Sequence, residues 1–222
     1  MTHLRLHAVN DWASLIVHLA LEELAVPYEI APHDWDAGTL ASPEFRALNP
    51  QGLLPVLETP DGPVFETGAI LLWLTETYGR LAPPPGSPGR TQFLSWFVFV
   101  ANTLHPTAVD LLHPDRPGGE ALAGAVGTVA KANLIAQLAL LEVEAALLPT
   151  WLQPQNPSIL SLYLLVILRW ITTFAADAAL NVRLDAFPHL QALVLAQELR
   201  PAIARVAEAE GLGPTPFSAA RA

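Results

Sequence analysis

The spacing of hydrophobic positions changes along the chain and divides it into two parts. Leu4 to His7 alternates between apolar and polar residues, as a short strand does. After a polar break, Val17, Leu21 and Leu24 recur at the spacing of a helix. Beyond residue 90 only helical patterns follow. We therefore expect an α+β chain whose strands all lie near its N-terminus.

The first 79 residues predict the element order βαβαββα. After the first strand and helix, turn residues and apolar runs mark the others. They are a strand at 28–30, a helix opened by Ser42 and Pro43, an apolar strand at 53–57, a hairpin turn at Asp61-Gly62 with a strand after it, and a helix from about Ile70 to Gly79.

The rest of the chain predicts a linker and an all-helical domain. Residues 80–89 are rich in proline and glycine, so we expect a stiff linker across which few contacts run. In the domain at 90–222, an apolar stripe spans 134–148, and Ser158 caps a helix that is apolar nearly all round through Leu168. That helix should be central and buried. Shorter helices are expected near 188–198 and 201–211, with a disordered tail after Gly213.

Composition bears on the cellular location. The chain is 52% hydrophobic and 14% charged. The longest strongly apolar run, Leu162 to Leu168, ends at Arg169 and is shorter than the ~20 residues of a membrane span. The N-terminus lacks the apolar region of a signal peptide. We expect a cytoplasmic protein with no membrane contact.

Charge and cysteine usage exclude several kinds of site. The formal net charge is −10, and the basic residues are scattered, so no stripe is available to neutralise nucleic-acid phosphates. There is no cysteine, which excludes disulfides, thiolate metal sites and a cysteine nucleophile. No pair of histidines has metal-ligand spacing backed by an acid, so we expect no metal.

The segment from Asn49 to Ile70 carries the densest chemical pattern. Pro55 interrupts an apolar strand, and a cis bond before it would turn the backbone of Leu54 outward to pair with an extended peptide. Glu66 and Thr67 stand where a strand gives way to a helix. Amides and a hydroxyl there suit a carboxylate, and the Glu66 carboxylate suits an ammonium. Taken singly, these residues are an edge proline, a solvated acid and a helix cap; together they predict a site for an amino-acid head group.

At this point the sequence resembles a known family. The motifs Asn-Pro-x-Gly-x-x-Pro-Val-Leu at 49–57, Asp-Gly at 61–62 and Glu-Thr-x-Ala-Ile at 66–70 are similar to the glutathione-binding half of cytosolic, bacterial-type glutathione S-transferases. The resemblance continues at 21–28, 157–163 and 200–203. It implies a thioredoxin-like domain, an all-helical domain, a homodimer, and glutathione as co-substrate in detoxification. Leu54, Pro55, Glu66 and Thr67 would bind it.

The implied reaction is attack of the glutathione thiolate on a small hydrophobic electrophile. Family members place a tyrosine, serine or cysteine after the first strand, where residues 8–14 here hold neither tyrosine nor cysteine. The candidates that remain are Ser14, Asn10 and backbone amides, with Trp12 near the sulfur. The Asp11 carboxylate would raise the pKa of the thiol unless it points away as a helix cap.

Other positions depart from the family or complete the site. Leu53 stands where members often carry lysine or glutamine for the glycine end of glutathione, so Gln51 or His33 is expected to compensate. Ser161 replaces the usual aspartate of a capping box, which weakens it. The electrophile is expected to contact residues of the fourth helix and the loop after it, unless the aromatic ones are core or dimer contacts: Trp96, Phe97, Phe99, Asn102, His105, His113 and Arg116.

Two alternative functions stay open at this level. The missing sulfur-activating residue favours a noncatalytic relative that serves protein–protein interaction, whereas the intact Pro55, Glu66 and Thr67 cluster favours an enzyme. A glutathione-dependent isomerase or dehalogenase would share the same glutathione site and differ only in its substrate.

Overall fold

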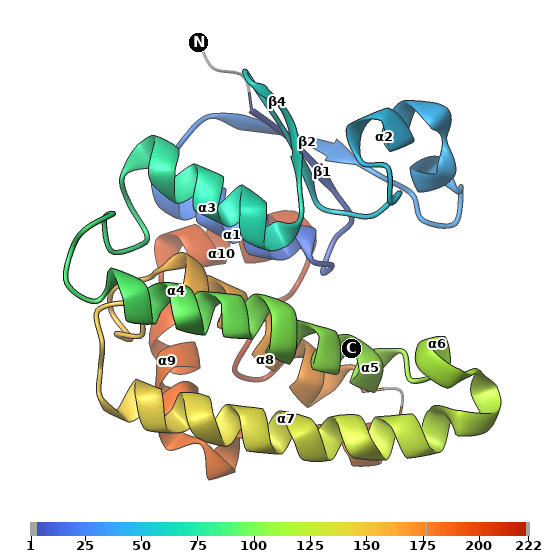
Figure 1. The fold of residues 1–222 in the computed structure, drawn as a ribbon, viewed down its shortest axis with the longest axis vertical. Helices are drawn as coiled ribbons and strands as arrows, with labels where there is room; N and C mark the ends of the chain where they lie inside the picture. Colours follow the sequence, from blue (N-terminus) through green and yellow to red (C-terminus); the bar gives the residue numbers. More distant parts are fainter. Residues whose placement is uncertain (1–3, 176, 221–222) are drawn as a thin grey trace.

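The computed structural model describes residues 4–175 and 177–220. A sheet with its covering helices forms one half of the molecule, and a set of helices forms the other (Figure 1). The element order predicted for the first 79 residues is confirmed.

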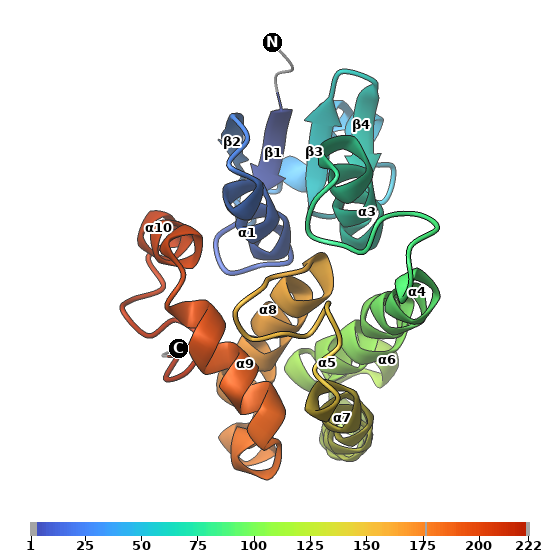
Figure 2. The same ribbon diagram turned by 90° about the vertical axis from the view of Figure 1, so that its left-hand side faces the viewer.

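The sheet has four strands in the order β2-β1-β3-β4. Strand β1 (Leu4–Ala8) pairs in parallel with β2 (Tyr28–Pro32) and antiparallel with β3 (Val56–Thr59), and β3 forms a hairpin with β4 (Gly62–Phe65). Helices α1 (Ser14–Leu24) and α3 (Thr67–Tyr78) cover one face (Figure 2). The short α2 (Pro43–Leu48) packs on the sheet through a small separate cluster of Leu40, Phe45 and Val56. This is a thioredoxin-like domain.

The remainder of the described chain is helical, with short 3-10 turns at Glu120–Leu122, Ala178–Leu180 and Leu184–Ala186; another, Thr39–Ala41, precedes α2 in the first domain. Helix α4 (Arg90–Phe99) runs through a π-helical turn, Val100–Leu104, into α5 (His105–Leu112). The turn α6 (Asp115–Gly118) precedes the long α7 (Ala123–Ala146). Helices α8 (Ile159–Thr173), α9 (Pro188–Glu198) and α10 (Pro201–Glu210) complete the domain. Every residue of α8 from Ile159 to Ile171 is buried, as its all-round apolar pattern predicts.

The start of α8 has a complete capping box. The Ser158 hydroxyl accepts from the Ser161 amide at 3.1 Å, and the Ser161 hydroxyl accepts from the Ser158 amide at 2.9 Å. Gln197 of α9 donates to the same Ser161 hydroxyl at 2.9 Å. Serine in place of aspartate therefore keeps both hydrogen bonds of the box, without the charge.

The boundary between the two domains differs from the sequence expectation. One continuous hydrophobic core runs from β1 and α1 into α4, α7 and α8. The Ile159 amide donates to the carbonyl of Leu81, in the linker itself, at 2.8 Å, and Arg200 of the second domain donates to the Glu23 carboxylate of α1 at 2.6 and 2.8 Å. Proline and glycine content identified the connecting segment but did not reveal how tightly the domains pack.

The segment after Gly213 was expected to be disordered, and over its described part, 214–220, that expectation is wrong. The Phe217 side chain is buried, and the amides of Phe217 and Ser218 donate to the Glu198 carboxylate at 2.7 and 2.8 Å. A single buried aromatic in a polar tail gave too weak a pattern to recognise. Residues 221 and 222 lie outside the described residues.

One helical stretch, Glu120–Ala146, is long and apolar enough to cross a membrane by length and composition alone, and the sequence interpretation overlooked it. Only 28% of its most apolar window is buried. The helix packs one face into the domain through small and apolar residues such as Ala130, Leu134, Leu138 and Leu141. A helix of a globular core meets the same length and composition test.

Candidate functional site

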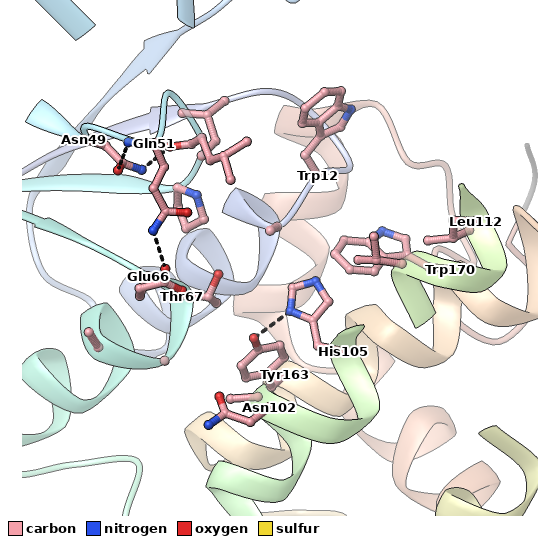
Figure 3. Close-up of a pocket in the computed structure, with 18 of the residues that line it drawn as sticks. Trp12, Asn49, Gln51, Glu66, Thr67, Asn102, His105, Leu112, Tyr163 and Trp170 are labelled. Atoms are coloured by element: carbon pink, nitrogen blue, oxygen red, sulfur yellow. Dashed lines mark hydrogen bonds between the residues drawn. The ribbon is translucent and has the colours of Figure 1, made fainter. Parts of the chain in front are cut away.

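A pocket of about 900 Å3 opens between the two domains. Its walls are the loop after β1, the segment before β3, the start of α3, and the facing sides of α4, α5 and α8 (Figure 3). Residues predicted to bind glutathione lie along the wall formed by the first domain: Gln51, Leu54, Pro55, Glu66, Thr67 and Trp12.

The Leu54–Pro55 peptide bond is cis. Strand pairing begins only at Val56, so the Leu54 backbone lies outside the ladder of the sheet. Pro55 is buried at the pocket wall, and the Asn49 side chain donates to the Leu53 carbonyl at 2.7 Å, which fixes the loop from within. Extended ligands pair with backbone segments that a sheet leaves unpaired.

Glu66 and Thr67 lie at the start of α3. Glu66 has φ of 70° and ψ of 119°, a conformation that is uncommon for a residue other than glycine and is concentrated at functional sites. Its carboxylate accepts a hydrogen bond from Gln51 at 3.1 Å and stays exposed, whereas Thr67 is buried. The first amides of a helix favour an anion, so this wall presents an acid beside an anion-binding helix end.

Ser14 does not line this pocket. Its side chain is fully buried, and its hydroxyl donates to the Val9 carbonyl at 2.8 Å and accepts from the Val9 amide at 3.2 Å. The hydroxyl closes the loop between β1 and α1. The structure therefore does not support Ser14 as a donor to a bound sulfur, because both partners of its oxygen lie within the loop.

Asn10 lines the pocket, but its amide nitrogen donates to the Glu210 carbonyl of α10 at 3.3 Å. The Glu210 carboxylate accepts from the Asp11 amide at 2.8 Å and from His18 at 2.7 Å. The end of α10 thus shapes the loop after β1, and Asn10 contributes to that contact.

Asp11 is not the helix cap that was considered. Ala13 stands at that position, and the Asp11 carboxylate pairs with Arg169 of α8, which donates at 2.6 and 2.8 Å. The Trp170 indole donates to the Asp11 carbonyl at 3.0 Å. Because the guanidinium compensates the carboxylate, Asp11 opposes a thiolate in the pocket far less than a free acid would.

Trp12 stands at the rim of the pocket, 37% exposed, with its ring centroid 5.1 Å from that of Trp35. Figure 3 shows it above the cavity, opposite Tyr163. His33 does not line the pocket; its ring lies 2.8 Å from the His7 ring nitrogen. Of the two residues expected to compensate for Leu53, only Gln51 is therefore at the site.

The helical wall centres on His105 and Tyr163. The His105 Nδ1 atom lies 2.8 Å from the Tyr163 hydroxyl, and the ring lies between Thr67 and Trp170 (Figure 3). Burial lowers the pKa of His105 to about 4, so the imidazole is neutral at neutral pH. Burial likewise raises the pKa of Tyr163, which keeps its proton. A neutral imidazole offers one donor and one acceptor nitrogen, and Nδ1 is occupied by Tyr163.

Most of the predicted electrophile contacts lie along this wall. Phe97, Asn102, His105, His113 and Arg116 line the pocket. Phe99 does not: its ring packs edge-on against Trp96 at 5.4 Å, so this pair forms part of the helix packing instead.

Several pocket residues were missed by reasoning from sequence. Tyr163 and Trp170 reach the cavity from α8, and Phe174 from the residue after it; the sequence marks α8 only as a buried apolar helix. Tyr163 lies inside the matched motif 157–163, and its hydroxyl in an otherwise apolar run was the available signal. No cluster of histidine or acidic residues that could hold a metal is found within residues 4–175 and 177–220.

Comparisons with known proteins show similarity to glutathione S-transferases along most of the chain, and to an elongation factor over a shorter stretch. A sequence model described as the glutathione S-transferase N-terminal domain matches residues 3–76. The chain is 28% identical over 203 residues to glutathione S-transferase GstA of Escherichia coli O157:H7, covering 90% of this chain and 94% of that protein. Elongation factor 1-gamma of Prunus avium is 48% identical over 62 residues, 28% of this chain and 14% of that protein. A sphingomonad glutathione S-transferase solved in complex with glutathione has a TM-score of 0.75 at 29% identity, covering 94% of this chain and all of that one.

Proposed function

Because this chain belongs to the glutathione S-transferase family, we propose that it binds glutathione in the interdomain pocket and transfers the thiolate to a small hydrophobic electrophile. The observation that carries this proposal is the wall formed by the Leu54 backbone, Glu66 and Thr67. Leu54 pairs with the cysteinyl backbone of glutathione. Glu66 binds the γ-glutamyl ammonium, and Thr67 with the first amides of α3 binds its carboxylate.

We assign activation of the sulfur to His105 and to the N-terminus of α1. Ala13, which precedes α1, lines the pocket, and the positive end of a helix favours a thiolate. The second ring nitrogen of His105 is not engaged by Tyr163, and in the neutral ring it can donate its N–H to the thiolate. Asn10 is a weaker candidate, because its amide already binds Glu210.

The test is a titration with glutathione that follows tryptophan fluorescence, since Trp12 stands at the rim of the pocket. Wild-type protein should bind saturably, and Glu66→Ala should weaken affinity by about tenfold or more, the loss of one charge-assisted hydrogen bond. Glu76→Ala is the matched control: it removes the same charge from the exposed side of α3, outside the pocket. Equal affinities of the Glu66→Ala and Glu76→Ala variants would contradict the assignment.

A noncatalytic role in protein–protein interaction is the second candidate. The engaged hydroxyl of Ser14 and the local similarity to elongation factor 1-gamma favour it. Saturable glutathione binding without conjugation of any activated aryl chloride would support this role, and turnover would exclude it. A glutathione-dependent isomerase or dehalogenase would instead turn over a different substrate in the same site.

We also propose that the protein is a homodimer, as its family membership implies. The outer face of α7 and the residue after it expose Val129, Leu140, Val143 and Leu147, each between 54% and 72% accessible. Surfaces of this kind are commonly covered in assemblies. Sedimentation should give the mass of a dimer, and a monomer at micromolar concentration would refute the proposal.

A further inference from the structure

The end of the pocket away from Glu66 combines an apolar wall with two basic side chains. The apolar lining comes from the ends of α5 and α8: Val109, Leu112, Trp170 and Phe174. Leu112 and Trp170 lie across the cavity from Glu66 and Gln51 (Figure 3). His113 and Arg116 follow α5 directly and complete this end.

Arg116 differs from every other arginine in the described chain. Six arginines form ion pairs with carboxylates: Arg5, Arg90, Arg169, Arg183, Arg200 and Arg205. Arg46 and Arg80 donate to backbone carbonyls. Within residues 4–175 and 177–220, the side chain of Arg116 has neither kind of partner. In a protein with 21 acidic residues, its positive charge is left uncompensated beside the pocket.

The groups around Arg116 do not neutralise it. Asp115 is its neighbour in the chain and Asp110 lies on α5, yet neither carboxylate comes within ion-pair distance of its guanidinium in the described structure. Burial and then the Arg116 cation lower the pKa of His113, while Asp115 raises it, so the ring is neutral at neutral pH and still has one N–H to donate.

We infer that the electrophile carries an anionic group, such as a carboxylate, which Arg116 binds and to which His113 donates a second hydrogen bond. A planar guanidinium matches the two oxygens of a carboxylate, and the apolar wall accommodates the rest of the molecule. The net charge of −10 repels anions at a distance, so the preference comes from this local contact. The inference rests on the proposed function, because the electrophile is the partner of the bound thiolate.

The test uses two aryl chlorides of the same shape, one anionic and one neutral: a chloronitrobenzoate and the corresponding benzamide, each with chlorine para to the carbonyl carbon and ortho to the nitro group. The glutathione thiolate attacks the carbon that bears chlorine; the C–S bond forms, the C–Cl bond breaks, and chloride leaves with the electron pair. For each compound, kcat/KM is divided by the rate constant with free glutathione, which removes the difference in intrinsic reactivity.

Wild-type protein should favour the benzoate by about tenfold or more, the gain from a charge-assisted hydrogen bond. Arg116→Gln should bring this preference near one, and Arg116→Lys should retain part of it. Arg183→Gln is the control, since Arg183 is exposed, pairs with Asp185 and lies outside the pocket. It should leave the preference as in wild type.

An undiminished preference in Arg116→Gln overturns the inference. So does a wild-type enzyme that conjugates the benzamide and shows no preference for the benzoate, although the proposed function then stands. Failure to conjugate either compound, together with no saturable glutathione binding, overturns the proposed function itself.

Discussion

The carboxylate of Asp11 accepts two hydrogen bonds from the guanidinium of Arg169, at 2.6 and 2.8 Å. Only 3% of the arginine side chain and 24% of the aspartate side chain are exposed. The same guanidinium also donates to the Pro216 carbonyl. One arginine therefore joins the loop after β1, the central helix α8 and the C-terminal segment.

Replacing one partner of the Asp11–Arg169 pair should destabilise the folded protein. Asp11→Asn leaves the guanidinium of Arg169 buried without its countercharge, and we expect the free energy of unfolding to fall by about 3 kcal/mol. Urea titration at neutral pH measures the loss. Asp185→Asn, which breaks the exposed pair with Arg183, should leave the midpoint unchanged. Coincident midpoints for wild type and Asp11→Asn would show that the pair contributes nothing.

Substitutions at Ser14 and at His105 should affect a bound thiol differently, because the two side chains lie in different places relative to the pocket. Ser14→Ala removes a hydroxyl bonded only to Val9, so stability should fall by about 1–2 kcal/mol while the pKa of the bound glutathione thiol stays the same. His105→Asn keeps a polar atom toward Tyr163 but loses the second ring nitrogen, so kcat/KM should fall by about tenfold or more.

The ultraviolet absorbance of the thiolate, followed against pH in the glutathione complex, separates these two roles. The bound thiol should lose its proton at a higher pH in the His105→Asn complex than in wild type. In the Ser14→Ala complex it should lose its proton at the same pH as in wild type. A raised thiol pKa in Ser14→Ala would return the activating role to the serine.

Burial of His105 also predicts how stability responds to acid. Its pKa is about 4 in the folded protein, against about 6.5 in the unfolded chain, so the unfolded state takes up the proton first as pH falls. Stability should therefore be lost between about pH 6.5 and about pH 4, by up to about 3 kcal/mol from this group.

His105→Asn should flatten that dependence without abolishing it. The pKa values of His33 and His113 are also lowered, in each case mainly by burial, and these groups remain in the variant. Urea unfolding of both proteins at several pH values across this window gives the comparison. If the free energy of unfolding changed with pH in the same way in wild type and variant, His105 would take up its proton equally readily in the folded and the unfolded state.

The sequence predicted the parts of the site that depend on short separations. Leu54 and Pro55 directly precede the β3–β4 hairpin, and Glu66 and Thr67 directly follow it, so the pairing of these two strands brings the four residues together. Side chains whose partners are remote in sequence could not be placed in this way. Arg169 looked only like the end of an apolar run, because Asp11 lies 158 residues before it.

The roles of other site residues could not be predicted from the sequence because they depend on the path of a loop. The role of Ser14 depends on whether its hydroxyl turns toward the pocket or toward Val9, and that choice is made by the loop from Val9 to Ala13. The Asp11 amide in this loop donates to the carboxylate of Glu210, which lies 199 residues after Asp11. The alternation and helical spacing that identify elements carry no information about such a contact.

Ser158 and Ser42 cap two helix starts that differ in how deeply they are buried. Ser158 caps α8 while 3% exposed, and its hydroxyl also donates to the Trp151 carbonyl at 2.7 Å. Ser42 caps the short α2 by accepting from the Phe45 amide at 3.1 Å, but it is only half-buried. Water can replace the lost partner at Ser42 but not at Ser158.

Ser158→Ala should therefore lower the free energy of unfolding by about 2 kcal/mol or more, because it leaves a buried amide and a buried carbonyl unpaired. Ser42→Ala should cost less than about 1 kcal/mol. Urea unfolding of the two variants beside wild type measures both losses. If the two substitutions cost the same, burial of the cap does not set its contribution, and the capping box of α8 is no more important to the fold than the cap of a surface turn.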